Sequence, residues 1–447
     1  MKSLHRNLSL SPPQILVSGF ALIIFVGAIL LSLPVSSADG KAFPLIDAFF
    51  TATSATCVTG LVVVDTGTHF SVFGQIVLLL LIQVGGLGFM TMSSLFAFML
   101  RKRITFRERL VLQQAMNQTS MEGIVRLIRK VILYSLTIEA VGAVVLTLRW
   151  SLDMRFGDAA YFGVFHAVSL FNNAGFDLFG EFKSLAEYAA DPVINIMAMF
   201  LIFTGGIGFV VLAEIVDWSR YRKKLSLHSK VALTTTVFLI LFGAIVLFIF
   251  EFSNAKTSGQ LNWSGKILSA FFQSVSSRTA GANTLNIADM RQASQFFLIL
   301  LMFIGASPGS TGGGIKTTTF AALIAAMIAM FRGKEDVVLF RFRLGKDRIY
   351  KALTITLFSL FLIILGAMVL STTEDHQFLM ILFEATSAFS TVGLSMGLTP
   401  TLTVFGKIII MLMMFIGRLG PLTMVYALNK KTPKELYRHP EGKIIIG

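Results

Sequence analysis

The sequence predicts an all-α integral membrane protein made of four tandem repeats around a single pore. Two observations support this fold class. The first is composition, because 55% of the 447 residues are hydrophobic, only 14% are charged and 42 are Phe, which is more apolar than a soluble enzyme. The second is a pair of glycine-containing landmarks that occurs four times along the chain. Each repeat is expected to hold an outer helix, a pore loop and an inner helix.

The charge pattern and the cysteine count argue against several other classes of protein. The net charge is +14, but the bases occur in short blocks between apolar segments, so nucleic acid is not an expected partner. A single cysteine, Cys57, excludes an internal disulfide, and the six histidines have no metal-ligand spacing. The start of the chain looks like a signal peptide. The apolar run from Ile15 to Pro34 is longer than a signal core, however, so a retained first helix is expected.

Eight apolar stretches are long enough to cross the membrane. A helix needs about 20 apolar residues to cross about 30 Å of hydrocarbon. The stretches lie near residues 15–34, 72–100, 128–150, 192–216, 230–252, 293–304 continuing past 315, 350–371 and 402–427. The predicted repeats are residues 1–100, 101–217, 218–332 and 333–447. The second begins with a cytoplasmic link, and the fourth ends in a cytoplasmic tail.

A shorter, half-apolar segment separates the two spans of each repeat. The four segments are LIDAFFTATSATCVTGL (45–61), YFGVFHAVSLFNNAGFD (161–177), ILSAFFQSVSSRTAGAN (267–283) and LMILFEATSAFSTVGLS (379–395). In each, one glycine follows the aromatic and hydroxyl residues, at intervals of about 110 residues. These glycines are Gly60, Gly175, Gly281 and Gly393. A helix of about 12 residues is too short to span the bilayer, so each segment is expected to enter the membrane and turn back.

A second landmark follows each pore segment at a nearly constant offset of about 25 to 30 residues. Its four copies are QVGGLGF (83–89), FTGGIGF (203–209), FIGASPG (303–309) and FIGRLGP (415–421). Two landmarks in the same order, four times over, indicate a fourfold internal repeat. Close helix packing is the role expected for the glycines of the first two copies, namely Gly85, Gly86, Gly88, Gly205, Gly206 and Gly208.

Basic residues are concentrated in the links between repeats. They are Arg101, Lys102, Arg103, Arg107 and Arg109 in the first link, Arg220, Arg222, Lys223 and Lys224 in the second, and Arg332, Lys334, Arg341, Arg343, Lys346 and Arg348 in the third. By the positive-inside rule these links and both termini are cytoplasmic. The pore segments are therefore expected to open to the outside.

Four re-entrant segments have the chemistry of a cation pore. Non-helical backbone at membrane depth is tolerated only where protein buries it or where it lines a watery path. The helix C-terminal ends carry partial negative charge, and glycine lets the backbone turn carbonyl groups toward an ion. Acids beside the segments are expected at the mouth, namely Asp65, Asp177, Glu181 and Asp375. The alternative is that the four pore-segment glycines serve helix packing alone, but each follows a helix too short to span.

At this point the chain resembles the Ktr/Trk/HKT superfamily of potassium transporters, most closely the membrane subunits of bacterial Ktr systems. The motifs that carry the resemblance are TSATCVTGLVVVDTGT, FNNAGF, SRTAGANTL, FSTVGLSMGLTP and MFIGRLGPLT. It implies four potassium-channel-like repeats, one pore in each subunit of a homodimer, and potassium uptake across the bacterial cell membrane driven by the electrochemical gradient. The implied filter residues are Thr56, Cys57, Val58, Thr59, Gly60, Asn172, Asn173, Ala174, Gly175, Arg278, Thr279, Ala280, Gly281, Ser390, Thr391, Val392 and Gly393. Four glycines go with potassium preference in this family, whereas a threonine or serine is more usual at Cys57.

The stretch GASPGSTGGGIKT (305–317) comes close to a phosphate-binding loop. Ile315 places Lys316 one residue too late for that motif, and the strand that should precede it is not expected. Residues 305–316 instead resemble the intramembrane loop of the family, which partly blocks the path and moves to let ions through. The implied gate residues are Gly305, Ser307, Pro308, Gly309, Gly312, Gly313, Gly314, Lys316 and Arg418.

Local chemistry gives some of these gate residues a role. The glycines are expected to make the loop flexible, and Pro308 to end the preceding helix. An arginine deep in a span needs partners, so Arg418 is expected to bind loop carbonyls instead of reaching the cytoplasmic interface. His166 and Glu384, on two pore helices, are expected only to pack or to form hydrogen bonds.

The resemblance also implies partners, and other function classes remain as alternatives. Regulation would come from a separate cytosolic nucleotide-binding ring of the KtrA type docked on the basic links, and the tail HPEGKIIIG would lie at the dimer interface. Membrane lipid is expected to surround the chain. No cofactor is expected in it, potassium is the expected substrate, and sodium is the expected activator.

Other function classes would leave different patterns in the sequence. A membrane-embedded enzyme would need a nucleophile and base or paired carboxylates, and a proton-coupled transporter would need acid relays in its spans. Neither pattern is evident. A sodium-permeable or cation-coupled transporter of the same fold is the nearer alternative.

Overall fold

The structure is a computed structural model of the chain. It describes residues 11–88, 91, 92, 94, 106–115, 123–222, 224–428, 440, 442 and 445. Several predictions concern residues outside this set, namely those on Arg101, Lys102, Arg103, Lys223 and most of the tail at 439–447. Within the described residues the only strands are β1 (Val338–Leu339) and β2 (Phe342–Arg343), which form an antiparallel hairpin.

The same order of helices occurs four times when the elements are grouped by the predicted repeat boundaries. The first repeat holds α1 (Pro12–Ser32), the 3-10 helix η1 (Pro34–Ser36), α2 (Leu45–Cys57), α3 (Thr66–His69) and α4 (Val72–Leu87). The second holds α6 (Phe106–Ala115), α7 (Ile124–Trp150), α8 (Phe156–Phe171), η2 (Ala186–Tyr188), α9 (Pro192–Gly206) and α10 (Phe209–Tyr221). The third holds α11 (Leu227–Glu251), η3 (Ser258–Gln260), α12 (Trp263–Ser276), η4 (Ile287–Asp289), α13 (Gln292–Phe303) and α14 (Thr317–Phe331). The fourth holds α15 (Lys346–Thr373), α16 (Phe378–Ser390), η5 (Thr399–Thr401), α17 (Val404–Leu419) and α18 (Pro421–Leu428).

The outer and pore helices have the lengths that the sequence predicts. Among the described residues, four single helices are long and apolar enough to cross a membrane, and they are the outer helices α1, α7, α11 and α15. The pore helices α2, α8, α12 and α16 have 13, 16, 14 and 13 residues. At about 1.5 Å per residue none of these reaches the roughly 30 Å of a hydrocarbon core. The short segments therefore fit re-entrant helices.

The inner helices differ from the prediction, because two predicted spans are each two helices. The span at 192–216 breaks between α9 and α10 with a bend of 105°, and the span at 402–427 breaks between α17 and α18 with a bend of 93°. The residues at the breaks are Gly208 and Gly420, with φ of 98° and 83°, and Gly88 after α4 has φ of 82°. These values are strained for any residue with a Cβ. The last glycine of the landmark thus breaks the helix in the first, second and fourth copies. For Gly88, where an added Cβ would meet nothing within 4 Å, the expectation of packing was wrong, whereas Gly208 also lies close to the carbonyl of Pro308.

The third inner helix is interrupted by a loop at residues 304–316. It ends at Phe303, well ahead of Pro308, so Pro308 does not end the helix as predicted. Ile304 and Ile315 form an isolated parallel bridge that closes the base of the loop. α14 begins after it. We call residues 305–314 the gate loop.

The first glycine of the second landmark packs closely in three copies, as predicted for Gly85 and Gly205 and as also found for Gly417. Added Cβ atoms at Gly85, Gly205 and Gly417 would overlap backbone carbonyl oxygens at the ends of pore helices, and these oxygens belong to Thr56, Phe171 and Phe389. The inner helices of the first, second and fourth repeats therefore lie with their backbone directly against the C-terminal end of the pore helix of the same repeat, whereas Gly305 in the third lies against Gly313 of the loop. This close approach is possible only for glycine.

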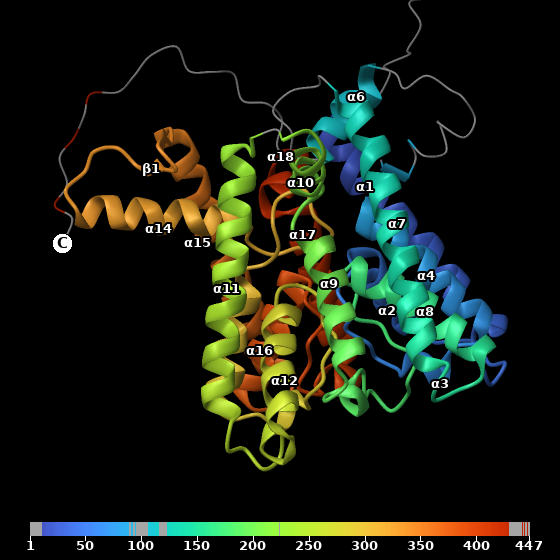
Figure 1. Cartoon of the computed structure of the whole chain (residues 1–447). Coiled ribbons are helices and arrows are strands. Elements are labelled where there is room, and N and C mark those ends of the chain that lie inside the picture. Colours follow the sequence, from blue (N-terminus) through green and yellow to red (C-terminus); the bar gives the residue numbers. More distant parts are fainter. Residues whose placement is uncertain are drawn as a thin grey trace, which may run out of the picture.

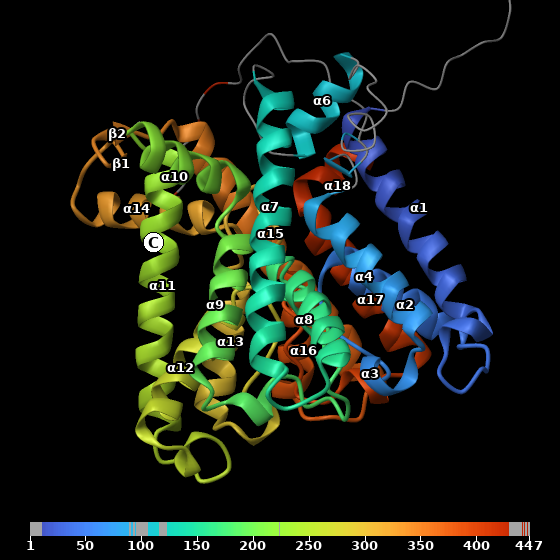
Figure 2. The ribbon, with the colours of Figure 1, turned by 45° about the vertical axis from the view of Figure 1, so that its right-hand side comes forward.

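The base-rich links lie at one end of the helix bundle. Figure 1 shows α6, α10, α18 and β1 at this end and α3 toward the other, while α14 projects sideways from the bundle. Arg109 lies in α6, Arg220 in α10 and Arg343 in β2. Figure 2 shows α1 and α11 on opposite sides of the bundle in that view. The arrangement agrees with links on a common side, and the sidedness of the membrane stays a prediction.

Candidate ion pathway

Gly60, Gly175, Gly281 and Gly393 come together in a closed ring. Their φ angles are 90°, 69°, 75° and 91°. An added Cβ at each glycine would overlap a carbonyl oxygen in the next repeat, in the order Ala174, Ala280, Val392 and Thr59. The contacts run from repeat one to two, three, four and back to one, so the four segments close on themselves. We call these four residues the glycine ring.

A second set of left-handed residues explains how each chain turns into the ring. Every residue two places before a ring glycine has positive φ, although none is glycine: Val58 57°, Asn173 59°, Thr279 79° and Thr391 50°. A residue with left-handed φ at a helix C-terminus reverses the chain direction. For threonine and valine this conformation is strained. Its occurrence in all four repeats indicates that the surrounding packing holds the turn.

Hydroxyl side chains of the pore helices brace the backbone beside the ring. Ser54 Oγ accepts from the N–H of Gly60 at 3.1 Å, and Ser387 Oγ accepts from the N–H of Gly393 at 3.0 Å. Ser169 Oγ donates to the carbonyl of Phe176 at 2.7 Å, and Ser276 Oγ donates to the carbonyl of Ala282. No sequence motif singled out these serines.

The residues three places before the ring glycines are fully or nearly fully buried, and two of them bind groups behind the ring. Asn172 Nδ2 donates to Gln83 Oε1 at 2.8 Å and to Glu139 Oε1 at 3.2 Å. Arg278 donates to the carbonyls of Thr236 and Gly305, at 3.3 and 3.1 Å. Of the predicted filter residues, Asn172 and Arg278 thus serve as supports through their side chains.

The other two residues at this position are Cys57 and Ser390, which are also buried. Cys57 is a free thiol packed in the core, as expected for a small apolar side chain behind the ring. Glu139 was not singled out from the sequence. It lies in the middle of α7 and is 6% exposed, so one span does contain an acid, and that acid is satisfied by Gln83 and Asn172.

The gate loop lies directly beside the glycine ring. Thr391 Oγ1 accepts from the N–H of Gly313 at 3.0 Å, and an added Cβ at Gly312 would overlap Thr279. Asn173, with its amide oriented to satisfy both its atoms, accepts from Thr311 Oγ1 at 3.3 Å. Three of the four left-handed residues therefore contact loop residues 311–313. The glycines of the loop are required for this fit.

The break in the second inner helix also holds the gate loop. The N–H groups of Ser307 and Thr311 donate to the carbonyls of Gly206 and Gly205, at 3.0 and 3.3 Å, and the N–H of Phe209 donates to the carbonyl of Gly309 at 2.8 Å. These backbone groups are free to pair because the helix is interrupted. Thr311, which no sequence motif singled out, bonds to Gly205, Asn173 and Arg418.

Two cationic side chains bind three consecutive carbonyls of the gate loop. Arg418 Nη1 donates to the carbonyl of Thr311, and its Nη2 donates to the carbonyls of Gly85 and Gly86. Lys316 Nζ donates to the carbonyls of Gly312 and Gly313, at 2.6 and 3.2 Å. The expected pairing of Arg418 with loop carbonyls is therefore present.

The contacts of Lys316 argue against a phosphate-binding loop. A phosphate site presents N–H donors and a lysine to the ligand, whereas Lys316 here binds the carbonyls of its own loop. The loop also follows the helix α13 and not a strand.

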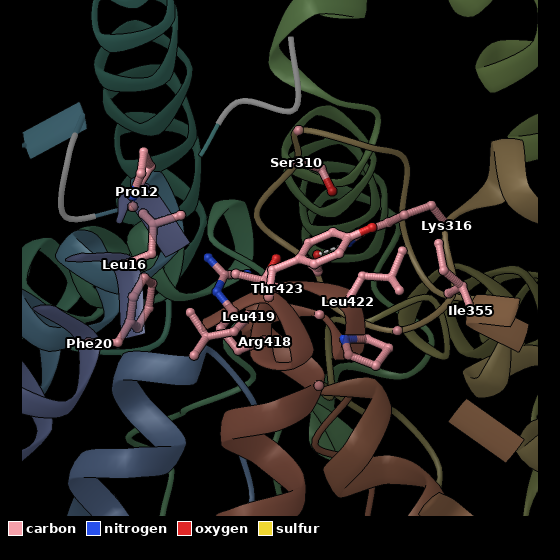
Figure 3. A pocket seen from close by; sticks show the side chains of 18 of the residues that line it. Pro12, Leu16, Phe20, Ser310, Lys316, Ile355, Arg418, Leu419, Leu422 and Thr423 are labelled. Atoms are coloured by element: carbon pink, nitrogen blue, oxygen red, sulfur yellow. Dashed lines mark hydrogen bonds between the residues drawn. The ribbon is translucent and has the colours of Figure 1, made fainter. Parts of the chain in front are cut away.

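A cavity of about 550 Å³ lies next to the gate loop. Figure 3 shows Arg418 near its centre, with Leu16 and Phe20 on one side and Lys316 and Ile355 on the other. The charged residues along its described wall are Lys316, Lys351 and Arg418, all basic. Leu110 of α6 and Tyr426 of α18 also line it, so the cavity lies on the base-rich side of the loop.

On the other side of the ring, the predicted mouth acids do not share one environment. Asp65 accepts from the N–H groups of Thr68 and Phe182, at 2.9 and 2.8 Å. Glu181 pairs with Lys183 at 2.7 Å, and Asp375 is exposed. Asp177 is partly buried in the loop after α8. Burial, and then the charge of Asp65, raise the pKa of Asp177 to about 7.

Cation uptake is therefore expected to rise as the external pH increases from about 6 to 8. Above its pKa of about 7, Asp177 is ionised and its negative charge concentrates cations at the ring. Below that pH it is neutral and the attraction is lost. Initial uptake rates across this range would test this. Asp177→Asn should flatten the profile, while Asp39→Asn, at an exposed residue paired with Lys41, should not. An unchanged profile in Asp177→Asn would contradict the assignment.

Comparison with known proteins identifies the family. A profile of the TrkH family, described as cation transport protein, matches residues 12–439. The chain belongs to the TrkH cation-transport family. This TrkH-family chain is 46% identical to "Ktr system potassium uptake protein B" of Bacillus subtilis, over 98% of the chain and 97% of that protein. It is 40% identical to "Potassium/sodium uptake protein NtpJ" of Enterococcus hirae, over 98% of each protein.

A solved structure agrees on the fold. The crystal structure of the potassium transporter TrkH from Vibrio parahaemolyticus superposes with a TM-score of 0.75 and covers 96% of this chain and 87% of that one, at 16% identity. The TrkH-family chain is a multi-pass membrane protein, as its family membership and its apolar helices show. It is a transporter and not an enzyme, as predicted.

Proposed function

We propose that this chain takes up potassium across the plasma membrane through the glycine ring, driven by the electrochemical gradient. The observation that carries the proposal is the ring itself, in which four left-handed glycines each lie against a carbonyl of the next repeat. Carbonyl groups held in this way can replace the hydration shell of a cation. A relative with 46% identity over nearly the whole chain is named a potassium uptake protein, which supports potassium as the ion.

The gate loop is the proposed barrier to conduction. Its residues 311–313 contact the side chains just below the ring, and Arg418 and Lys316 bind its carbonyls. A cation beside the path opposes the passage of another cation. Opening would then require the loop to leave the ring and the two side chains to change partners. The other predicted gate residues of this loop are Gly305, Ser307, Pro308, Gly309 and Gly314.

A separate regulatory subunit is the proposed control of the gate. The relatives named as components of a Ktr system support a cytosolic partner of the KtrA type, which would bind nucleotide and dock on the base-rich end. The proposed assembly is a homodimer in lipid. The far end of α14 supports it, because Met330 and Phe331 are 81% and 82% exposed on a helix that projects from the bundle (Figure 1).

The direct test is ion uptake in cells that lack their own potassium uptake. The chain would be expressed with and without a Ktr-type cytosolic subunit, and initial potassium and sodium uptake would be measured. We expect potassium entry to exceed sodium entry, and the subunit to raise the rate. Absence of uptake in every pairing would contradict the proposal.

Sodium permeation is the second candidate function, because one relative is named a potassium/sodium uptake protein. The same assay separates the two, since equal entry of the two ions would favour a cation pathway without potassium preference. Measuring potassium uptake with and without external sodium would test the proposed role of sodium as an activator.

A further inference from the structure

Three pore helices carry a buried polar side chain that accepts hydrogen bonds from the chain leaving the glycine ring. These residues are His166 on α8, Gln273 on α12 and Glu384 on α16, with exposed fractions of 2%, 0% and 0%. Neither the ring nor the gate loop uses them. We call them the pore-helix acceptors.

The contacts of His166 fix its role as an acceptor. Its Nδ1 lies 2.8 Å from the carbonyl oxygen of Phe162, which can only accept, so Nδ1 carries the proton. Its Nε2 then accepts from the backbone N–H of Leu178 at 3.4 Å. Leu178 lies just beyond Gly175 in the segment that leaves the ring.

Glu384 holds the corresponding segment of the fourth repeat with more bonds. Its Oε1 accepts from the backbone N–H of Thr399 at 2.9 Å, from Thr399 Oγ1 at 2.5 Å and from Ser395 Oγ at 2.6 Å. Ser395 and Thr399 both follow Gly393. One carboxylate thus ties two points of this segment to the pore helix.

Gln273 does the same in the third repeat. With its amide oriented so that the oxygen faces the segment after Gly281, it accepts from the N–H groups of Thr284 and Leu285 at 3.2 and 3.1 Å. Gln273 is one residue nearer to its ring glycine than His166 and Glu384 are to theirs. The device therefore occurs in three repeats with three different side chains.

The first repeat lacks this device. Thr51 stands at the position of His166 and Glu384, and its buried hydroxyl has no hydrogen-bond partner among the described residues. This repeat provides a natural internal comparison.

The segments after the ring need such acceptors for a physical reason. They have little regular secondary structure, so their buried N–H groups cannot pair within a helix or a sheet, and each requires another partner. An acceptor on the rigid pore helix fixes the segment relative to that helix. The ring glycine lies between the pore helix and this segment, so its position is then fixed as well.

We propose that His166, Gln273 and Glu384 are positioning residues that set the geometry of the glycine ring and so contribute to its choice between cations. This inference rests on the proposed function of the ring as the filter. The three residues touch no ion and act through the backbone on either side of the ring. In the first repeat, which has no such acceptor on its pore helix, Ser54 accepts from the N–H of Gly60, and Gln75 of the inner helix donates to the carbonyls of Gly67 and Phe70.

The test compares two variants of Glu384. Glu384→Leu removes every hydrogen bond of this side chain but keeps a side chain of similar size, whereas Glu384→Gln keeps an acceptor oxygen. Potassium and sodium uptake would be measured in competition, because a change in protein amount alters both rates equally and leaves their ratio unchanged. We expect Glu384→Leu to lower the potassium-to-sodium ratio by about threefold or more, the usual scale for lost hydrogen bonds. Glu384→Gln should restore most of the ratio. Thr51→Val, at the same position of the first repeat, should leave it unchanged.

A native ratio in Glu384→Leu, or an equal fall in Thr51→Val, would overturn the inference. If Glu384→Leu does not reach the membrane, Gln273→Leu against Gln273→Glu decides in the same way. A parallel Gly393→Ser separates this inference from the proposed function. If Gly393→Ser lowers the ratio and the acceptor variants do not, only the positioning role fails. If none of them changes it, the ring is not the filter.

Discussion

Gly393→Ser is expected to remove most of the preference for potassium over sodium. Gly393 has φ of 91°, and an added Cβ would overlap the carbonyl oxygen of Thr59 in the first repeat. A side chain in the left-handed region costs about 1 to 2 kcal/mol, and the overlap forces the Thr59 carbonyl to move. Since 1.4 kcal/mol corresponds to about tenfold, the potassium-to-sodium uptake ratio should fall by about tenfold or more.

Gly397→Ser is the matched control for this substitution. Gly397 lies in the same segment with φ of 92°, but an added Cβ there meets nothing within 4 Å. It therefore carries the same backbone strain without the contact on a neighbouring carbonyl. We expect its uptake ratio to stay near the native value. If both variants lose the preference equally, backbone strain and not the ring contact is responsible.

Arg418→Ala is expected to increase potassium uptake in the absence of a cytosolic subunit. The guanidinium joins the carbonyl of Thr311 in the gate loop to those of Gly85 and Gly86 in the first repeat. Its removal takes away one attachment of the loop and a positive charge beside the path. A unit charge about 4 to 8 Å from a passing cation opposes it by about 2 to 4 kcal/mol at an effective dielectric of 20, so uptake should rise by about tenfold or more.

Two further variants separate the gate role of Arg418 from the effect of removing any cation from α17. Arg418→Lys keeps the charge but loses the fork that reaches two backbone segments, so an intermediate rate is expected. Lys407→Gln removes another cation of α17 that pairs with Asp47 at 2.6 Å, and it should leave the basal rate unchanged. A lower or native uptake rate in Arg418→Ala, with normal protein in the membrane, would contradict the barrier.

The repeats and the ring could be predicted from the sequence because only glycine fits where the backbone is left-handed and a Cβ would overlap a neighbouring carbonyl. Four glycines at regular intervals mark such points, and each has positive φ in the structure. The same residue type was misleading in the second landmark. Gly85 and Gly88 look alike in the sequence, yet the first allows close packing and the second breaks the helix, because the sign of φ depends on neighbours that the sequence does not specify.

The side-chain contacts between repeats could not be predicted from the sequence for a similar reason. Thr311 and Thr391 are far apart in the chain and lie in different motifs, but Thr311 bonds to Asn173 beside the ring and Thr391 bonds to Gly313 of the gate loop. Arg418 was easier to interpret because an arginine within a span requires acceptors. His166 and Glu384 were noticed as polar residues on pore helices. Their partners depend on the path of irregular segments that no periodicity predicts.

The role of the glycine ring as the filter is tested most directly by locating the bound ion. A crystal structure of the native chain with rubidium in place of potassium would reveal bound ions through their anomalous scattering. We expect a peak on the axis between Gly60, Gly175, Gly281 and Gly393, and its loss in Gly393→Ser. Ions bound only elsewhere, with none inside the ring, would contradict the claim that these four glycines form the filter.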